Sequence, residues 1–404
     1  MREADIRGDR TLRASDRPAA GGQRGDYAER FQSALSRNGR GSLWPGKPRM
    51  AGIVPPAGIA DANRWPVSGG REYTSGGGHS DGGVVRPFGV GQYSRGLSFN
   101  QFIAPDGYSW WYFDALSEDG SHGLTLIAFI GSVFSPYYAL ARRRGTASPL
   151  NHCAVNVALY GPRGQRWAMT ERPRASVQRF SQALKIGPSM LSWDGNMLKV
   201  EIDEVTAPLP SRIRGEIRLY PTSLSGEQIS LDPDGRHQWC PIAPCSHVEV
   251  DLKQPAIRWS GPGYMDANTG GGPLEDSFSG WNWSRAKIHR DTAVIYDVTP
   301  REGDDLSIAL RFSPAGRTDA FDPPPRRRLP ATGWRVGRET RADETCQPRV
   351  RRTLEDGPFY ARSLLSTRIL GEDVTAIHES LSLDRFKSGL VKAMLPFRMP
   401  RWPL

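Results

Sequence analysis

The chain has 404 residues and a formal net charge of +10 at pH 7. Residues 1–85 contain 13 Lys and Arg against 9 Asp and Glu, and residues 385–404 contain five basic residues and no acidic one, so most of the charge lies at the two ends. A nucleic-acid-binding protein would be expected to carry basic clusters on its folded body. The distribution therefore argues against a nucleic-acid partner, whereas basic ends suit an anionic membrane surface.

The sequence lacks the marks of a membrane-spanning or secreted protein. The longest apolar run, at residues 123–134, has about a dozen residues, whereas a spanning helix needs roughly 20. The first residues, MREADIRGDR, mix acids and bases and lack the apolar segment of a secretory signal. The cysteines do not form the framework typical of small disulfide-rich domains; they are Cys153, Cys240, Cys245 and Cys346. We therefore expect a cytoplasmic protein with reduced thiols.

Residues 1–85 are rich in Gly, Ser, Pro and Arg and show no sustained apolar period. Such a segment cannot bury enough apolar surface to offset the entropy that is lost on ordering. We expect a disordered basic tail that takes no part in the chemistry.

From about residue 98 onward, short runs rich in aromatic and β-branched residues alternate with turn sequences such as DG and PRG. No long amphipathic helix pattern interrupts them. About twenty such runs predict an all-β protein, and they exceed what one sheet usually holds. We expect two antiparallel barrels or sandwiches in tandem, at residues 86–250 and 251–385, with the seam near residues 245–260. A barrel of about eight strands can enclose one ligand.

The last residues, 386–404, interleave aromatic and leucine side chains with basic ones. One interpretation is a disordered C-terminus. The other is a peripheral membrane contact, in which the aromatic side chains enter the headgroup region and the basic ones meet anionic lipid.

Strand alternation groups the candidate site residues, because residues i and i+2 face the same side of a strand. Four such groups stand out: His237 with Trp239, Tyr264 with Asp266, Trp281 with Trp283, and Trp110 with Tyr112 and Asp114. Two of the groups couple a titratable side chain to an aromatic one. If both point into a barrel, one apolar cavity holds an acid, an imidazole and two aromatic faces.

Such a set can protonate an electron-rich double bond and add water to it. An apolar pocket disfavours the charged form of a carboxyl group, so the pKa rises and the acid can stay protonated near neutrality. Aromatic faces stabilise a cation, and a histidine can orient or deprotonate water. A Tyr-x-Asp pair in a β protein is more often a turn or edge carboxylate, so the residues alone leave the function open.

Two other kinds of site are weaker. Zinc sites favour closely spaced cysteine pairs, and CPIAPC puts four residues, two of them proline, between its thiols. A zinc site is therefore disfavoured; its ligands would be Cys240, Cys245, His237 and His247. The glycines of GPGYMDANTGGG are followed by no Lys-Ser/Thr pair, which argues against a phosphate-binding loop.

Several further polar residues have ordinary structural interpretations. Asp114 precedes a DG turn, where an Asp accepts turn hydrogen bonds. Glu275 and Asp276 are expected to be solvated loop carboxylates. His152 is interpreted as a satisfied core or rim histidine, and His378 has no partner that the sequence identifies.

Several long blocks resemble the carotenoid 1,2-hydratases (hydroxyneurosporene synthases) of phototrophic bacteria. The resemblance covers roughly residues 98–385 and excludes the N-terminal tail. It is carried by GYSWWYFDALSEDG, LTLIAFIGSVFSPYYA, NHCAVNVALYG, SMLSWDGN, HQWCPIAPCSHVEV and GYMDANTGGGPLEDSFSGWNWSRA. It implies tandem lipocalin-like barrels, no cofactor and no metal. It also implies hydration of the terminal 1,2 double bond of acyclic carotenoids such as neurosporene and lycopene, at a photosynthetic inner membrane.

The resemblance also implies roles for individual residues. Asp266 is the proton donor, near His237, Trp239 and Tyr264. On this hypothesis Asp266 protonates C2, the tertiary cation at C1 rests against Trp239 and Tyr264, and water held by His237 or by the new carboxylate attacks C1. Further aromatic residues are expected to bind the polyene: Trp281, Trp283, Trp110 and Tyr112.

Two other classes of function stay open at this stage. One is a non-catalytic carrier that binds an apolar isoprenoid and passes it between the membrane and enzymes. The other is a cyclase or pericyclase on the same fold, in which the acid triggers a rearrangement and no water is incorporated.

Overall fold

The computed structural model describes residues 96–401. The expected disordered tail at residues 1–85 lies outside the described residues, as do residues 402–404. Among the described residues no helix is long and apolar enough to cross a membrane.

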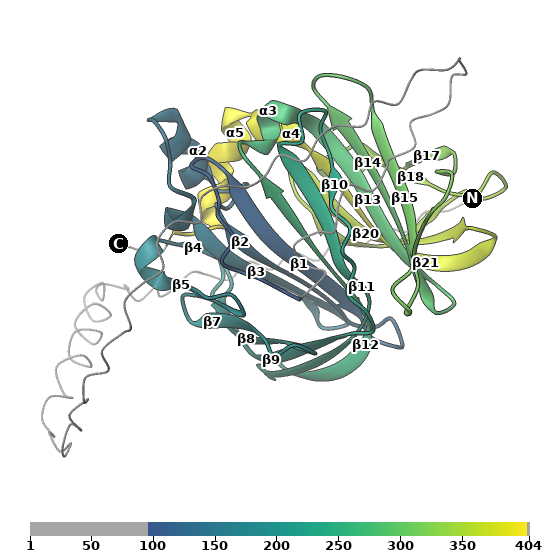
Figure 1. The fold of residues 1–404 in the computed structure, drawn as a ribbon, viewed down its shortest axis with the longest axis horizontal. Coiled ribbons are helices and arrows are strands. Elements are labelled where there is room, and N and C mark those ends of the chain that lie inside the picture. Colours follow the sequence, from purple (N-terminus) through teal and green to yellow (C-terminus); the bar gives the residue numbers. More distant parts are fainter. Residues whose placement is uncertain (1–95, 402–404) are drawn as a thin grey trace, which may run out of the picture. The chain divides into compact units, whose positions relative to one another are not determined.

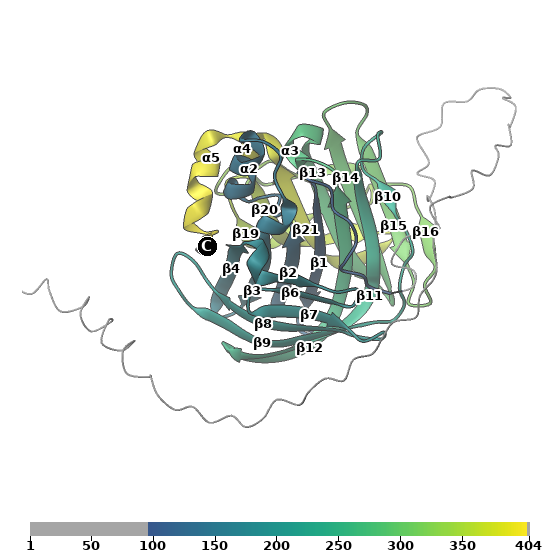
Figure 2. The ribbon, with the colours of Figure 1, turned by 60° about the vertical axis from the view of Figure 1, so that its left-hand side comes forward.

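The first sheet winds into a nearly closed antiparallel barrel (Figures 1 and 2). Its strands are β1 (Tyr108–Leu116), β2 (Gly123–Ile130), β3 (Cys153–Gly161), β4 (Gly164–Arg172), β5 (Val177–Arg179), β6 (Ala183–Ile186), β7 (Ser189–Trp193), β8 (Leu198–Val205), β9 (Arg212–Pro221), β10 (Ile229–Ser230), β11 (His237–Gln254) and β12 (Ala256–Gly270). They pair in the order β4-β3-β2-β1-β12-β11-β9-β8-β7-β6-β5, and β10 pairs with β11. The sheet curls so that β3 and β4 lie against β6 and β8.

The second sheet is antiparallel, in the order β16-β15-β14-β13-β21-β20-β19. Its strands are β13 (Phe278–Ile288), β14 (Asp291–Pro300), β15 (Leu306–Phe312), β16 (Thr318–Ala320), β19 (Arg349–Asp356), β20 (Tyr360–Ile369) and β21 (Glu372–Ser382). A separate hairpin joins β17 (Arg326–Leu329) to β18 (Arg338–Arg341). The all-β prediction is thus confirmed, as a nearly closed barrel followed by a second antiparallel sheet.

The chain passes from the first sheet to the second at residues 271–277, and not at residues 245–260 as expected. The long hairpin of β11 and β12 keeps residues 237–270 in the first sheet, so the expected boundary at residue 250 falls inside β11. The register shifts between Pro241 and Ala243 and again between Ala243 and Ser246. Prolines cannot donate to the ladder, so CPIAPC forms an irregular stretch of a strand and does not end the sheet.

Short helices gather at one end of the two sheets (Figures 1 and 2). They are α2 (Pro136–Arg143), η1 (Pro149–Asn151), η2 (Arg174–Ser176), α3 (Leu274–Ser277), α4 (Leu383–Lys387), α5 (Gly389–Met394) and η3 (Leu395–Phe397). The last three, with the residues that follow them up to Arg401, form the C-terminal segment, and Arg401 pairs with Glu171 of β4. Phe386 is fully buried, so within the described residues this segment is packed on the protein and is not a disordered end.

Strand β1 is buried on both faces and separates two cores. Trp111 and Phe113 point into the barrel, where an apolar cluster from both walls fills the interior. Trp110 and Tyr112 point the other way and belong to a second cluster, which also contains Trp283 and other residues of the second sheet. The barrel interior is therefore a packed core, and the expected ligand site inside it is replaced by a site between the sheets.

This division predicts different costs for neighbouring substitutions on β1. Trp111→Ala removes a fully buried ring from the barrel core and should lower the free energy of unfolding by about 3–5 kcal/mol. Trp110→Ala should cost less, because its ring borders a cavity. Urea unfolding of both variants measures the difference, and a larger loss for Trp110→Ala would contradict the assignment of the two cores.

Candidate active site

A cavity of about 240 Å³ lies between the two sheets. The first sheet contributes Trp110, Tyr112, Phe129, Trp167 and Asp266, among others. The second sheet contributes Trp281, Trp283, Tyr296 and Glu379, and the C-terminal segment contributes Leu395, Arg398 and Met399. The wall is thus mainly aromatic and apolar, with few carboxyl groups.

Asp266 is the buried acid of this cavity. Its Oδ2 atom accepts hydrogen bonds from Trp239 Nε1 at 2.8 Å and from the Tyr264 hydroxyl at 2.8 Å. Burial raises the pKa of Asp266 from 3.8 to about 7, and the two hydrogen bonds oppose that rise. Near neutral pH a substantial part of the protein therefore holds Asp266 in its protonated form, as a proton donor requires.

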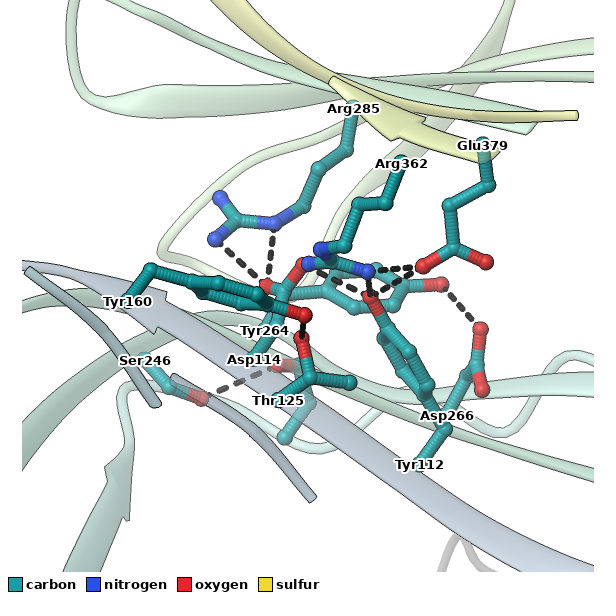
Figure 3. A network of polar contacts seen from close by, with 11 residues as sticks. Tyr112, Asp114, Thr125, Tyr160, Ser246, Tyr264, Asp266, Arg285, Arg362 and Glu379 are labelled. Carbon is teal, nitrogen blue, oxygen red and sulfur yellow. Dashed lines mark hydrogen bonds and ion pairs between the residues drawn. The ribbon is translucent and has the colours of Figure 1, made fainter. Parts of the chain in front are cut away.

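Beside Asp266 lies a buried network of ions that joins the two sheets (Figure 3). Asp114 of β1 accepts from Arg285 Nε at 2.6 Å and from Arg362 Nη2 at 2.6 Å. Arg362 also donates to Glu379 Oε1. The Tyr112 hydroxyl lies 2.7 Å from Asp114 Oδ2 and 3.0 Å from Glu379 Oε1.

The charges of this network explain which carboxyl group is neutral. It contains two guanidinium groups, and each of the carboxylates of Asp114 and Glu379 contacts at least one of them. Asp266 contacts neutral donors only, so its ionisation would add an uncompensated charge in a buried place. Glu379 and Asp114 also raise the pKa of Asp266 through their negative charges. Among these three carboxyl groups, Asp266 is therefore the one without a guanidinium partner to stabilise its charged form.

Most of the predicted site residues come together here. Trp110, Tyr112, Trp281 and Trp283 line the cavity with Asp266. Trp239 and Tyr264 lie behind it, where they hold the carboxyl group and pack against other rings. Tyr264 lies 5.3 Å from Trp283, and Trp239 lies 5.5 Å from Tyr296, centroid to centroid. The aromatic faces that border the empty space are therefore mainly those of other residues.

His237 is not among the residues that line the cavity. Its Nδ1 lies 2.9 Å from the Tyr108 hydroxyl of β1, and its Nε2 lies 2.9 Å from Ser277 Oγ, just before β13. Burial lowers the pKa of His237 to about 4, so the ring is neutral near pH 7. Through these two contacts His237 links the first sheet to the start of the second. Its expected role in holding water stays a prediction, and its position outside the cavity lining does not support that role.

The residues considered for a zinc site are spread over different environments. Cys240 belongs to the barrel core and Cys245 to the cluster between the sheets, whereas His247 is exposed. Within residues 96–401 there is no group of three or more His, Cys, Asp or Glu residues arranged to hold a metal ion.

Some structural interpretations were wrong. Asp114 is not a turn carboxylate, because its fully buried side chain forms ion pairs with Arg285 and Arg362 of the second sheet. Glu275 is buried and pairs with Lys392 Nζ at 3.1 Å, whereas Asp276 is exposed as expected. His378 does have a partner, the Glu339 carbonyl at 2.8 Å from its Nε2. His152 is satisfied as expected, by Glu171 at 2.9 Å.

Comparison with known proteins identifies the family. The family described as "Carotenoid hydratase CrtC" matches residues 126–403. The chain belongs to this family. The acyclic carotenoid 1,2-hydratase of Thiocapsa roseopersicina is 55% identical over 375 residues, which cover 93% of each chain. The protein of the same name from Rubrivivax gelatinosus is 46% identical and covers 99% of this chain and 100% of its own.

A shorter relative supports the same assignment. The acyclic carotenoid 1,2-hydratase of Cereibacter sphaeroides is 42% identical over 279 residues, which cover 69% of this chain and 98% of its own. The resemblance of the sequence blocks to the carotenoid 1,2-hydratases is therefore confirmed.

The network between the sheets predicts a large loss of stability on removal of its central charge. Asp114→Asn leaves Arg285 without its carboxylate, and breaking a buried ion pair in this way costs about 3–5 kcal/mol. Asp203→Asn is the control, because it breaks the more exposed pair with Arg212 and should cost less than about 1 kcal/mol. Chemical denaturation of both variants measures this, and equal losses would contradict the account.

Proposed function

We propose that this chain is an acyclic carotenoid 1,2-hydratase, a hydro-lyase that adds water across the terminal C1–C2 double bond of an acyclic carotenoid. The product is a tertiary 1-hydroxy carotenoid, and neurosporene and lycopene have suitable ends. The observation that carries the proposal is the buried Asp266, whose pKa burial raises to about 7, in an aromatic cavity of a chain that belongs to the carotenoid hydratase family.

The geometry supports a stepwise reaction. Asp266 delivers its proton to C2, because protonation there leaves the positive charge on the tertiary carbon C1. The rings of Tyr112, Trp283 and Tyr296 line the cavity, and aromatic rings there can stabilise that cation. Water then bonds to C1 and loses a proton. The apolar wall limits access to a small number of water molecules and keeps side reactions of the cation rare.

The size of the cavity fits one end of the substrate. The cavity volume of about 240 Å³ is smaller than the roughly 300–1,000 Å³ of pockets that enclose a whole drug-sized ligand. A carotenoid is larger than such a ligand. The terminal isoprene units therefore enter the cavity, and the rest of the polyene extends outside it.

The two other classes of function have distinct outcomes in one assay. The chain is incubated with lycopene or neurosporene in H₂¹⁸O, and a hydratase gives 1-hydroxy product that carries the label. A carrier would bind the polyene and leave it unchanged, and a cyclase would give an isomer without oxygen. A buried carboxyl group with a raised pKa favours an enzyme over a carrier, because binding of an apolar polyene does not require a buried acid.

The pKa of Asp266 predicts the alkaline limb of the pH profile, the range in which activity falls as the pH rises. The protonated form is the active one, so kcat/KM should be highest below about pH 7 and fall roughly tenfold per pH unit above it. Tyr264→Phe removes a hydrogen bond that lowers this pKa, so the limb should move to higher pH. Asp266→Asn should abolish hydration. Normal turnover by Asp266→Asn, or a flat profile through pH 9, would disprove the assignment of the acid.

We also propose that the protein binds the cytoplasmic face of an anionic inner membrane through its C-terminal segment. Leu390 and Phe397 are each 74% exposed, whereas Leu395 and Met399 of the same segment line the cavity. Exposed apolar side chains next to basic ones suit a lipid interface. A polyene that leaves the bilayer there would reach the cavity along the same segment.

The membrane proposal predicts a selective defect. Leu390→Ser with Phe397→Ser should reduce binding to vesicles of mixed neutral and anionic phospholipid and slow hydration of lycopene in those vesicles. Hydration of detergent-dispersed lycopene should stay within about twofold of the unsubstituted protein. Leu209→Ser, a change at an 82% exposed apolar residue elsewhere, is the control. Unchanged vesicle binding in the double variant would disprove this contact.

A further inference from the structure

A second carboxyl group faces the same cavity from the opposite sheet. Asp266 lies on β12 of the first sheet, and Glu379 lies on β21 of the second. The side chain of Glu379 is 13% exposed, whereas those of Arg285, Arg362 and Asp114 are 5%, 1% and 0% exposed. Glu379 is thus the charged member of the ion network that water in the cavity reaches most easily.

We propose that Glu379 is the catalytic base that takes the proton of the attacking water. This inference rests on the proposed hydratase function. Asp266 transfers a proton to C2, the water oxygen bonds to C1, and Glu379 takes one hydrogen of that water. A proton then passes from Glu379 to Asp266 through water and restores the starting state, so that only H and OH are added to the substrate.

The charges of the network favour this sequence of steps. At rest, two guanidinium groups face two carboxylates, and Asp266 is neutral. When Asp266 has donated its proton, the protein carries one additional negative charge beside the substrate cation. When Glu379 takes the proton of the water, the network gains one positive charge, which offsets the negative charge of ionised Asp266, so the site as a whole is neutral again. No step leaves a net charge in the buried network without an opposite charge nearby.

The contacts of Glu379 suit a base held in one orientation. Tyr112 and Arg362 both contact its Oε1 atom, and Tyr360 also hydrogen-bonds the carboxyl group. Burial raises the pKa of Glu379 above its ordinary value, and Arg362 opposes the rise, so the carboxylate is a stronger base than an exposed glutamate. His237, the other candidate base, has both ring nitrogens occupied outside the cavity lining.

Glu379 also affects the acid on the opposite wall. The titratable or charged groups around Asp266 are Tyr112 and Asp114 of β1, Cys240 of β11, Tyr264 of β12, Arg285 of β13, Tyr296 of β14, Arg362 of β20 and Glu379 of β21. Among their charges, that of Glu379 raises the pKa of Asp266 most. Loss of this charge lowers the pKa of Asp266 and moves the alkaline limb to lower pH.

The test compares hydration with hydrogen exchange in D₂O. Asp266 then delivers a deuteron to C2. A cation that water fails to capture loses H from C2 and returns as deuterium-labelled alkene, or loses D and returns as the unlabelled alkene. Glu379→Gln should slow hydration by about 100-fold, while deuterium uptake into recovered lycopene stays within about tenfold of the unsubstituted protein. The alkaline limb of its residual activity should shift to lower pH.

Two further variants make the outcome decisive. Asp266→Asn should lose hydration and exchange together. Glu355→Gln changes another buried carboxyl group of the cavity wall, hydrogen-bonded to Tyr160, and should leave the ratio of hydration to exchange and the alkaline limb unchanged. Glu379→Gln with near-normal hydration, or with an equal loss of hydration and exchange, would overturn the role of Glu379. Absence of labelled product from the unsubstituted protein in H₂¹⁸O would instead overturn the proposed function itself.

Discussion

The carboxylate of Asp114 and the guanidinium groups of Arg285 and Arg362 form a buried ion cluster that crosses from the first sheet to the second. Ions of this kind are costly to bury, and they persist because each charge has close partners of opposite sign. The cluster holds the facing walls in register and fills part of the space between them. It also affects the electrostatic environment of Asp266, which lacks a cationic partner and has a pKa raised to about 7.

The aromatic wall acts together with this charge pattern. Asp266 loses the solvation of water, which raises its pKa, and Trp239 and Tyr264 keep the carboxyl group in place. In the proposed mechanism, the surrounding rings stabilise a cation that forms only during the reaction. Because the barrel interior is a packed apolar core, the reactive space lies between the sheets, and the C-terminal segment closes one side of it.

Local patterns predicted much of this arrangement. Strand parity placed Tyr264 with Asp266 and Trp110 with Tyr112, because alternation is a property of each strand alone. Pairing between distant strands is not local, so the partners of Asp114 on β13 and β20 could not be predicted. A signal was nevertheless present, since Arg362 in YARSLLSTRI is a charged residue inside an apolar strand, and such residues need a buried partner. The seam was misplaced because β11 and β12 pair with each other over residues 237–270 and keep this stretch in the first sheet, and such pairing is not visible in a local pattern.

Infrared difference spectroscopy measures whether the Asp266 carboxyl group is protonated at rest. The spectrum of Asp266→Asn is subtracted from that of the unsubstituted protein over a pH series. We expect the C=O stretch of a protonated carboxylic acid in the unsubstituted protein, sensitive to D₂O and lost with a midpoint near pH 7. Absence of this band at pH 6 would show that Asp266 is already ionised and would contradict its role as the proton donor.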